Sequence, residues 1–400
     1  MQPVIIIHHH EIILKGDNRQ FFERRLQQNI QLALAGILPP DAVRGGYGKF
    51  FIFFEDNGKI PIITERITKV FGIANICFGM KIEQDVDEMC RTAEMLLKDL
   101  QFKTIRVDAR RPDKNFPVRS MEINSKVGAH ICHVFGVRAN LTSPDATVYI
   151  EVVDGFAYVY CSKIEGAKGL PSGVSGRVVA LLSAGFDSPV AAWQIMKRGA
   201  HCVFVHFHSL PYTSQQSIEQ VRQLVNVLTQ FQFSSKLLFI PFADIQQEIV
   251  LKTPPPFRVL MYRRMMVRIA EAIAQREKAE ALITGEAVGQ VASQTLRNIH
   301  VIDDAATLPI LRPLSGADKE ETMAFARRIG TFEISNEPYD DCCSFLAPRS
   351  PSTWATLSEI HEAEAKLDVP LLIQKGLGAA ETEMFYYPVP KAEVVSAETA

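Results

Sequence analysis

Along the first 165 residues, the pattern of hydrophobic and polar positions switches every few residues between a strand period and a helix period. This pattern predicts short strands alternating with helices. Alternating runs predict strands at 4–7, 50–55, 104–109, 146–153 and 156–162, and the helical period fits 20–35, 86–100 and 120–135. The last two strands flank Asp154-Gly155, a dipeptide typical of a tight β-hairpin turn. Short strands and helices mixed in this way indicate α+β domains.

Continuous apolar runs replace this alternation after residue 176. They predict buried strands at 178–182, 202–207, 236–241 and 281–284, separated by helices at 189–198, 215–231 and 257–276. The Gly-, Ser- and Pro-rich segment 165–176 reads as a linker or flexible loop, and the tail after Glu381 is predicted to be poorly ordered. The expected fold class is therefore α/β, with a doubly wound parallel-sheet domain preceded by two smaller α+β domains.

Composition narrows the class of protein. The chain has 400 residues, of which 47% are hydrophobic and 22% charged, as in a globular protein with two or three domains. It contains no run of about 18 uncharged apolar residues, so we expect no membrane span, and its start lacks the basic region of a secretory signal. Seven cysteines without a CxxC pair favour a reducing compartment and disfavour a zinc or iron–sulfur site. The net charge of −2 does not by itself indicate a nucleic-acid partner.

A small-residue loop, 183–188, follows the first strand of the second half. Ligands of parallel sheets bind at the carboxyl ends of strands, where this loop lies. We expect Gly185 to take a positive φ and let backbone N–H groups approach an anion. Asp187 or Ser188 is expected to cap the next helix, whose first turn suits Pro189 and whose N-terminus adds partial positive charge. The loop lacks the GxxxxGK[ST] of a Walker motif, and a plain strand–turn–helix explains it equally well.

The stretch LLSAGFDSPVAAW, 181–193, resembles the phosphate loop of the PP-loop ATP pyrophosphatases, whose pattern is Ser-Gly-Gly-x-Asp-Ser. A closer resemblance, over nearly the whole chain, is to the tRNA 4-thiouridine synthetase (tRNA sulfurtransferase) family. The other segments that carry it are EIILKGDNRQFFE (11–23), VFGIA (70–74), DARRPDKNFPVRSMEINSKVGAHI (108–131), HFHS (206–209), RRMMVRIAE (263–271), GEAVGQVASQTL (285–296) and DDCCSF (340–345). Several motifs in the right order are more specific than one loop.

The resemblance implies three domains. A ferredoxin-like domain (1–73) and a THUMP RNA-binding domain (74–165) are followed by a linker (166–176), a PP-loop ATP pyrophosphatase domain of the adenine nucleotide α-hydrolase type (177–385) and a flexible tail (386–400). The sequence departs from the family at Ala184, where glycine is usual, and at His8-His9-His10, where Arg-Tyr-Gly is usual. The chain as given does not include the rhodanese domain that some members carry.

The activity implied by the resemblance is ATP-dependent sulfur transfer to tRNA, in the cytoplasm. The family adenylates the uridine at position 8 with ATP, together with Mg²⁺, and replaces its C4 oxygen by sulfur to give 4-thiouridine. The sulfur comes from a persulfide donor such as a cysteine desulfurase with its pyridoxal cofactor. The family is also associated with thiazole sulfur transfer in thiamine biosynthesis. The sequence leaves open whether the chain forms a homodimer.

The resemblance also assigns residues, each by its match to a family motif. Cys343 matches the sulfur-carrying cysteine, Asp187 and Ser188 are expected to help hold pyrophosphate or metal, and no separate metal-ligand set is expected. The residues expected to contact ATP are Leu181, Leu182, Ser183, Ala184, Gly185, Phe186, Asp187, Ser188, His206, Phe207, Arg263, Gly285 and Gln294. Taken alone, Arg263 with Arg264 and Arg268 reads as a solvated helix face, and Cys343 as a buried cysteine.

A basic stretch, 106–126, is the expected RNA-binding surface, together with 15–25. The expected contacts are Lys15, Arg19, Arg106, Arg110, Arg111, Lys114, Arg119 and Lys126. Such side chains contact phosphate and position RNA without reading its sequence. A solvated protein face is the alternative for either stretch.

Two other functions fit the same motifs. One is a PP-loop enzyme with another chemistry on RNA or a small acid, which needs ATP but no cysteine. The other is an RNA-binding protein whose ATP site has decayed, for which Ala184 is the main argument.

Overall fold

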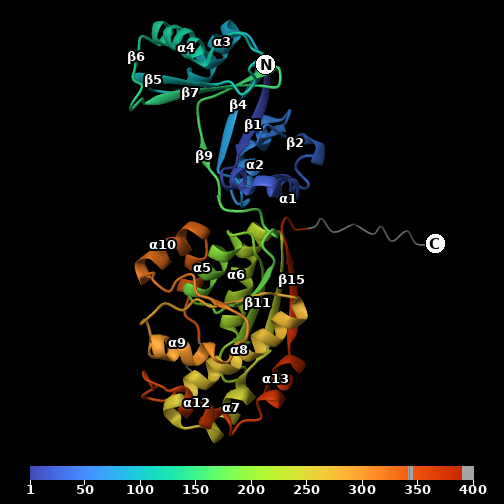
Figure 1. Cartoon of the computed structure of the whole chain (residues 1–400), viewed down its shortest axis with the longest axis vertical. Coiled ribbons are helices and arrows are strands. Elements are labelled where there is room, and N and C mark those ends of the chain that lie inside the picture. Colours follow the sequence, from blue (N-terminus) through green and yellow to red (C-terminus); the bar gives the residue numbers. More distant parts are fainter. Residues whose placement is uncertain (341, 343–345, 390–400) are drawn as a thin grey trace, which may run out of the picture. The chain divides into compact units, whose positions relative to one another are not determined.

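The computed structural model of the chain describes residues 1–340, 342 and 346–389. The chain forms two compact units, Met1–Pro171 and Ser172–Ala400 (Figure 1). Among the described residues, no helix is both long and apolar enough to cross a membrane.

One sheet of nine strands runs through the whole first unit, in the order β2-β3-β1-β4-β8-β7-β5-β6, with β9 also paired to β4. The strands are β1 (Gln2–His8), β2 (Val43–Gly46), β3 (Lys49–Phe53), β4 (Asn75–Glu83), β5 (Thr104–Arg110), β6 (Arg138–Ala139), β7 (Ala146–Val153), β8 (Phe156–Tyr160) and β9 (Ile164–Glu165). The long strand β4 pairs antiparallel with β1 on one side and β8 on the other. The two expected α+β patterns therefore share a single sheet.

The α-helices of this unit are α1 (Arg19–Ala33), α2 (Ile60–Ile67), α3 (Val86–Leu97) and α4 (Ser120–Phe135). Helices α3 and α4 bury their apolar faces against β5, β7 and β8, where Ile123 and Val127 of α4 join the same core as Val107 and Ile150. The predicted bounds of α4 are confirmed, because Gly136 ends the helix with a φ of 64°, a left-handed conformation that glycine adopts freely.

Side chains on the opposite face of this sheet meet one another. The rings of Phe51 on β3 and Tyr158 on β8 stack 4.5 Å apart and belong to one buried cluster. Beside them the buried Glu151 of β7 accepts hydrogen bonds from His8 Nε2 (2.9 Å) and Tyr160 Oη (2.8 Å), and pairs with Lys49. Burial lowers the pKa of His8 to about 3, so the ring is neutral. An apolar and ionic cluster therefore joins the two halves of the sheet.

The predicted hairpin turn is confirmed. Asp154 and Gly155 have φ values of 53° and 75°, the pair of positive angles that a two-residue type I′ turn requires. The segment read as a flexible loop is instead held by main-chain hydrogen bonds. Gly166 N donates to Ala74 O (3.0 Å) and Lys168 N to Ile73 O (2.8 Å).

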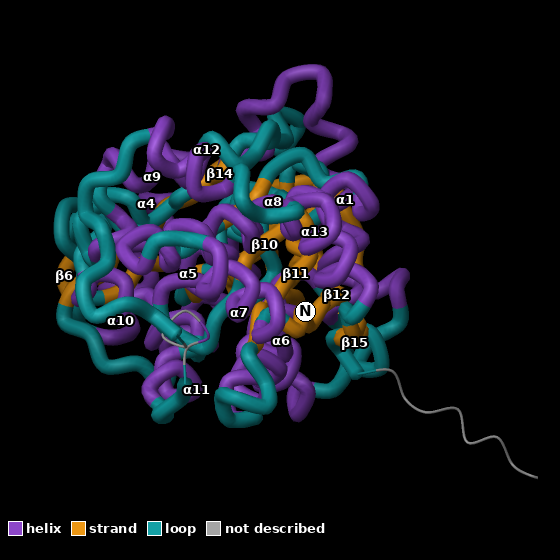
Figure 2. Tube along the Cα trace, turned by 90° about the horizontal axis from the view of Figure 1, so that it is seen from below, coloured by secondary structure: helices purple, strands orange, loops and turns teal. Residues whose placement is uncertain are grey.

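The second unit contains the predicted parallel sheet, in the order β14-β13-β10-β11-β12-β15. Its strands are β10 (Arg177–Leu181), β11 (His201–His208), β12 (Ser234–Pro241), β13 (Leu282–Ile283), β14 (Ile310–Leu311) and β15 (Glu381–Tyr386). Strands β10 to β14 pair in parallel, and Figure 2 shows β10, β11, β12 and β15 in sequence across the sheet. From β10 the chain first adds β11 and β12 on one side of the sheet, and later adds β13 and β14 on the other side. The carboxyl end of β10 is therefore the switch point, where such sheets bind ligands.

The prediction of a poorly ordered tail after Glu381 is wrong for 381–386. This segment forms β15, antiparallel to the edge of β12. Arg222 on a neighbouring helix contacts both carboxylate oxygens of Glu383, with Nε 3.0 Å from each oxygen. Strand pairing with β12 and the ion pair between Arg222 and Glu383 hold this segment in place. Its short sequence of mixed polarity does not predict a strand.

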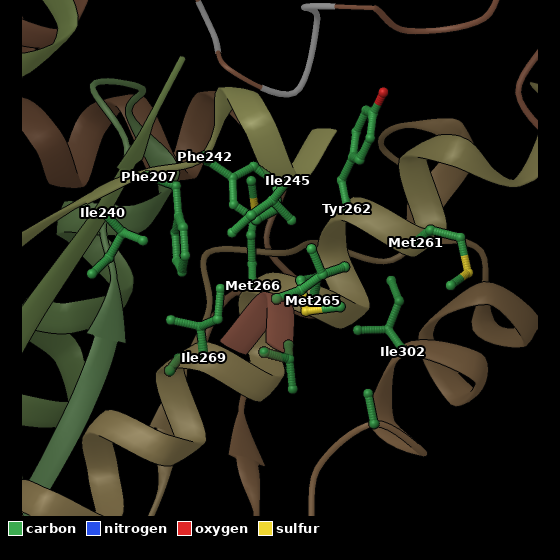
Figure 3. Packing of buried hydrophobic residues seen from close by; sticks show 14 of the residues in the cluster. Phe207, Ile240, Phe242, Ile245, Met261, Tyr262, Met265, Met266, Ile269 and Ile302 are labelled. Atoms are coloured by element: carbon green, nitrogen blue, oxygen red, sulfur yellow. The ribbon is translucent and has the colours of Figure 1, made fainter. Parts of the chain in front are cut away.

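The α-helices of the second unit are α5 (Asp187–Met196), α6 (Gln216–Gln232), α7 (Ala243–Lys252), α8 (Arg258–Glu277), α9 (Leu296–Asp303), α10 (Lys319–Ile329), α11 (Phe332–Asn336), α12 (Leu357–Glu364) and α13 (Val369–Gly378). Helix α8 supplies the centre of the core, where Met265, Met266 and Ile269 gather beside Phe207 and Ile240 from the sheet (Figure 3).

Candidate active site

A cavity of about 270 Å³ opens at the carboxyl ends of β10, β11 and β13. All of the residues expected to contact ATP line it except Phe186. The lining consists of Leu181, Leu182, Ser183, Ala184, Gly185, Asp187, Ser188, His206, Phe207, Ser217, Arg263, Met266, Thr284, Gly285, Glu286, Gln290, Val291, Gln294, Tyr339, Asp340 and Cys342. Residues from five separate sequence motifs therefore meet at the switch point of the sheet.

The 183–188 loop is closed by Ser188. Its hydroxyl accepts a hydrogen bond from the main-chain N of Ser183 (2.9 Å) and donates one to Ser183 O (3.1 Å). The expected helix cap is absent, because Phe186 occupies the N-cap position and no side chain caps α5. The ring of Phe186 lies 5.2 Å from that of Phe332, which explains why it does not line the cavity. The first turn of α5 still faces this loop with its partial positive charge.

The expected positive φ at Gly185 is not found, because Gly185 is not among the described residues whose φ is positive. A side chain at Gly185 would instead meet the hydroxyl of Tyr339, 3.0 Å from the added Cβ. Gly285 is more tightly enclosed, because a Cβ there would lie 2.6 Å from the main-chain N of Ser188. The lack of a side chain at both glycines lets other parts of the protein pack against the loop. The sequence had suggested that the glycines instead make room for a ligand.

Asp187 is the acidic residue of the 183–188 loop, and it lines the cavity. Burial raises the pKa of its carboxyl, while a hydrogen bond from Gln290 Nε2 (3.2 Å) and the charge of Lys319 oppose this shift. Among the described residues, no group of three or more His, Cys, Asp or Glu side chains is arranged to hold a metal ion.

Glu286 organises the arginines at the wall of the cavity. It accepts hydrogen bonds from Arg263 Nη1 (2.9 Å) and Arg312 Nε (2.6 Å). Burial opposes ionisation, yet the charges of Arg263 and Arg312 keep the pKa of Glu286 below its usual range. Glu286 and Arg312 were not among the residues expected from the sequence. The position of Glu286 directly after Gly285, in a motif assigned to ATP, could have pointed to it. Arg312 Nη2 also donates to Asp303 Oδ1 (2.6 Å), so the two guanidinium groups are matched by two carboxylates. Of the two arginines, Arg263 lines the cavity, where its planar guanidinium suits contact with a phosphate.

The plain interpretation of the α8 arginines as a solvated face is wrong. Arg264 is fully buried and contacts Glu364 (2.6 Å) and Asp304 (3.0 Å). Arg268 also contacts Glu364, at 2.8 Å. These two arginines stabilise the packing of α8, and Arg263 lines the cavity.

His206 lines the cavity in a neutral form. Burial lowers its pKa to about 4, and Nδ1 donates a hydrogen bond to Leu182 O (2.9 Å). His206 is buried on its strand and lines the cavity, as expected. Its Nε2 is buried without a hydrogen-bond partner among the described residues, so the strand does not satisfy both ring nitrogens. Its neighbour Phe207 packs edge-on against Phe242, with 5.3 Å between the ring centroids.

Cys343 lies outside the described residues, as does Asp341. The described residues next to them are informative, because Tyr339, Asp340 and Cys342 all line the cavity. Sequence reasoning did not place Tyr339 or Asp340 at the nucleotide site.

The expected RNA-binding residues divide into two groups. Arg110, Lys114, Arg119 and Lys126 are exposed. Others are engaged with the protein: Arg111 with the carbonyl oxygens of Phe116 and Val118, Arg106 with Leu141 O (3.3 Å), Arg19 with Glu23 (2.8 Å), and Lys15 with the ring of Phe22 (5.1 Å). Two of the exposed side chains also form surface ion pairs, Arg110 with Asp108 (3.5 Å) and Lys126 with Glu122 (3.1 Å). Exposed pairs of this kind contribute little free energy, so the exposed group is the part of the predicted surface open to phosphate.

A parallel sheet with a small-residue loop, a helix N-terminus and paired arginines at its switch point defines an α/β domain of the nucleotide-binding class. Family models agree with the sequence motifs: "Thiamine biosynthesis protein (ThiI)" matches residues 173–369, the ThiI ferredoxin-like domain 4–77, and the THUMP domain 83–162. The chain belongs to the ThiI family of tRNA sulfurtransferases.

Three relatives define the extent of the similarity. The chain is 43% identical to a probable tRNA sulfurtransferase of Thermoanaerobacter sp. (strain X514), over 92% of this chain and 96% of that protein. It is 40% identical to the corresponding protein of Moorella thermoacetica, over 99% and 100%. A crystal structure of a 4-thiouridine synthetase–RNA complex with bound ATP is 35% identical, covers 96% of this chain and 100% of that one, and has a TM-score of 0.88.

Proposed function

We propose that the chain is an ATP-dependent tRNA sulfurtransferase that converts the uridine at position 8 of tRNA to 4-thiouridine. The observation that supports this most strongly is the shared cavity, which is lined by residues of the 183–188 loop, by Arg263, and by Tyr339, Asp340 and Cys342. In the proposal, the loop would hold phosphate and Cys342 directly precedes the sulfur carrier in sequence, so both halves of the reaction would use this cavity.

The proposed reaction has two chemical steps. The C4 oxygen of the uracil attacks the α-phosphate of ATP, and pyrophosphate leaves. The terminal sulfur of a persulfide on Cys343 then attacks C4 and displaces AMP, because adenylation has made the oxygen a leaving group. A second thiol then attacks the Cys343 sulfur of the C4–S–S–Cys343 disulfide, which releases 4-thiouridine and leaves a disulfide between that thiol and Cys343. A thiol reductant supplied to the reaction returns Cys343 to the thiol for the next turnover.

The cavity residues divide the work by their chemistry. The α5 N-terminus and the Ser183–Ser188 loop would hold the pyrophosphate, and Arg263 would contact phosphate oxygens. Asp187 fits Mg²⁺, which binds through one or two carboxylates together with substrate phosphates. Bound Mg²⁺ would neutralise phosphate charge. Neutral His206 and Phe207 would border the adenine.

The proposed partners follow from the same reaction. The exposed basic group on the first unit, Arg110, Lys114, Arg119 and Lys126, would contact tRNA phosphates. A cysteine desulfurase or another persulfide donor would load Cys343. We place the enzyme in the cytoplasm, in keeping with six described cysteines that are free thiols. A homodimer and a contribution of sulfur to thiamine synthesis belong to the same proposal.

Nucleoside analysis tests the proposal. Unmodified tRNA incubated with enzyme, Mg-ATP and a persulfide donor should yield 4-thiouridine, one AMP and one pyrophosphate per modified uridine. ATP cleavage without a thionucleoside would favour another PP-loop chemistry, and tRNA binding without ATP cleavage would favour a decayed site.

A further inference from the structure

Glu337, Asp340 and Cys342, at or beside the cavity, are each hydrogen-bonded to another part of the second unit. The tethers are Gln220 Nε2 to Glu337 O (3.0 Å), the main-chain N of Ser214 to Asp340 Oδ2 (3.1 Å), and Gln246 Nε2 to Cys342 O (2.7 Å). The last of these hydrogen bonds fixes the carbonyl of Cys342, which lines the cavity and directly precedes Cys343 in sequence.

The Gln246 tether is buried and directional. Gln246 on α7 and Ser209 after β11 are both completely inaccessible to solvent. The Ser209 hydroxyl donates to Gln246 Oε1 (2.5 Å), so the amide oxygen is committed to Ser209 and the amide nitrogen points to Cys342 O. The neighbours of Gln246 on α7, Ile245 and Ile249, belong to the apolar core. An amide costs free energy in such surroundings unless it is hydrogen-bonded, which favours this one arrangement.

We propose that Gln246, oriented by Ser209, is a positioning residue for the sulfur-transfer step. The inference rests on the proposed function, in which Cys343 carries the sulfur. Consecutive Cα atoms lie about 3.8 Å apart, so a fixed Cys342 carbonyl restricts where the sulfur carrier begins. Attack on C4 needs an approach of about 3–3.5 Å, and a misplacement of about 1 Å can cost roughly a hundredfold in rate. Adenylation uses no thiol and does not depend on this tether.

The test compares Gln246→Met with Gln232→Met. Methionine keeps the length and much of the volume of glutamine but cannot donate a hydrogen bond. Gln232 is a matched control, because it is also buried and its Nε2 donates to a cysteine carbonyl, Cys202 O (2.9 Å), without lining the cavity. Three quantities are measured for each purified variant: thermal unfolding, the burst of tRNA-dependent pyrophosphate per enzyme without a sulfur donor, and single-turnover 4-thiouridine formation with a persulfide donor.

Gln246→Met should keep the pyrophosphate burst within about twofold of the wild type and lower the rate of thiolation at least tenfold. Gln232→Met should leave the ratio of thiolation to adenylation unchanged, whatever its effect on unfolding. An unchanged ratio in Gln246→Met, in an enzyme that Cys343→Ser inactivates for thiolation, would overturn the positioning role and leave the proposed function standing. Full thiolation by Cys343→Ser would remove the proposed carrier, and the positioning role with it.

Discussion

Single residues at the loop show how contacts from distant parts of the chain decide local conformation. Gly185 was expected to serve the turn itself, yet the nearest atom to an added side chain is the Tyr339 hydroxyl, more than 150 residues later in sequence. Glu286 likewise becomes informative only when α8 brings Arg263 beside it. The motifs assigned thirteen residues to ATP, and twelve of them line this one cavity. Their partners could not be predicted, because they converge only in the fold.

Gly285→Ala should weaken ATP binding at least tenfold, which is about 1.4 kcal/mol. The new methyl would lie 2.6 Å from Ser188 N, so the start of α5 must shift. Isothermal titration with ATP measures the effect. Gly316→Ala is the matched control, because a Cβ there meets nothing within 4 Å and φ is not positive. Equal affinities in the two variants would contradict the close packing of Gly285 against the loop.

Asp187→Asn should abolish tRNA-dependent pyrophosphate release while leaving the free protein as stable as the wild type or more stable. Burial raises the pKa of Asp187, so the folded state is penalised once the carboxyl ionises. Removing that charge is therefore stabilising at neutral pH, and the difference should shrink as pH falls below the raised pKa, where both side chains are neutral. Thermal unfolding of both proteins between pH 4 and 8 measures this difference in stability. A gain in stability over the wild type that is smaller at pH 8 than at pH 4 would contradict the raised pKa.

Elements followed the sequence where local signals were strong. Helix α4 matches its predicted range because its apolar period ends at a glycine that can turn the chain. Strand β15 was missed because ETEMFY is short and mixed, and its order comes from β12 and from Arg222. The sharing of one sheet by two patterns was also missed, since pairing of β4 with β8 is a long-range choice that periodicity does not record.

Glu151→Gln should destabilise the first unit by about 3 kcal/mol, because it leaves Lys49 buried without its counter-charge. Adding Lys49→Met should recover part of the loss, since no unpaired charge then remains. Glu94→Gln is the control; its partner His130 is partly exposed, and such pairs contribute roughly 0–1 kcal/mol. Urea unfolding gives the free energy of unfolding of the wild type and of the three variants. Equal losses of this free energy in Glu151→Gln and Glu94→Gln would contradict a stabilising ionic cluster.

At the scale of the whole molecule, the domain order and the α/β class were predictable, because each unit carries its own hydrophobic period. The proposed RNA-binding surface depends on exposure that charge counts do not record. Charge counts treat Arg110 and Arg111 alike, while the structure leaves Arg110 exposed and directs Arg111 to the carbonyl oxygens of Phe116 and Val118.

Arg110→Ala should weaken binding of many tRNAs alike and reduce the slope of log affinity against log salt by about one phosphate contact. Arg111→Ala should act mainly by loosening the 111–118 segment, and should lower the thermal unfolding temperature more than Arg110→Ala does. Binding titrations at several salt concentrations, with unfolding measured in parallel, separate the two. A salt slope unchanged by Arg110→Ala would move the RNA surface elsewhere.

The most direct test of the account follows one oxygen atom. A tRNA that carries ¹⁸O at C4 of the uridine at position 8 is incubated with the enzyme, Mg-ATP and a persulfide donor, and the AMP is analysed by mass spectrometry. Attack of the uracil oxygen on the α-phosphate predicts one ¹⁸O in each AMP, in equal amount to the 4-thiouridine formed, and none in the pyrophosphate. AMP without ¹⁸O, alongside 4-thiouridine, would contradict adenylation of the base at this cavity.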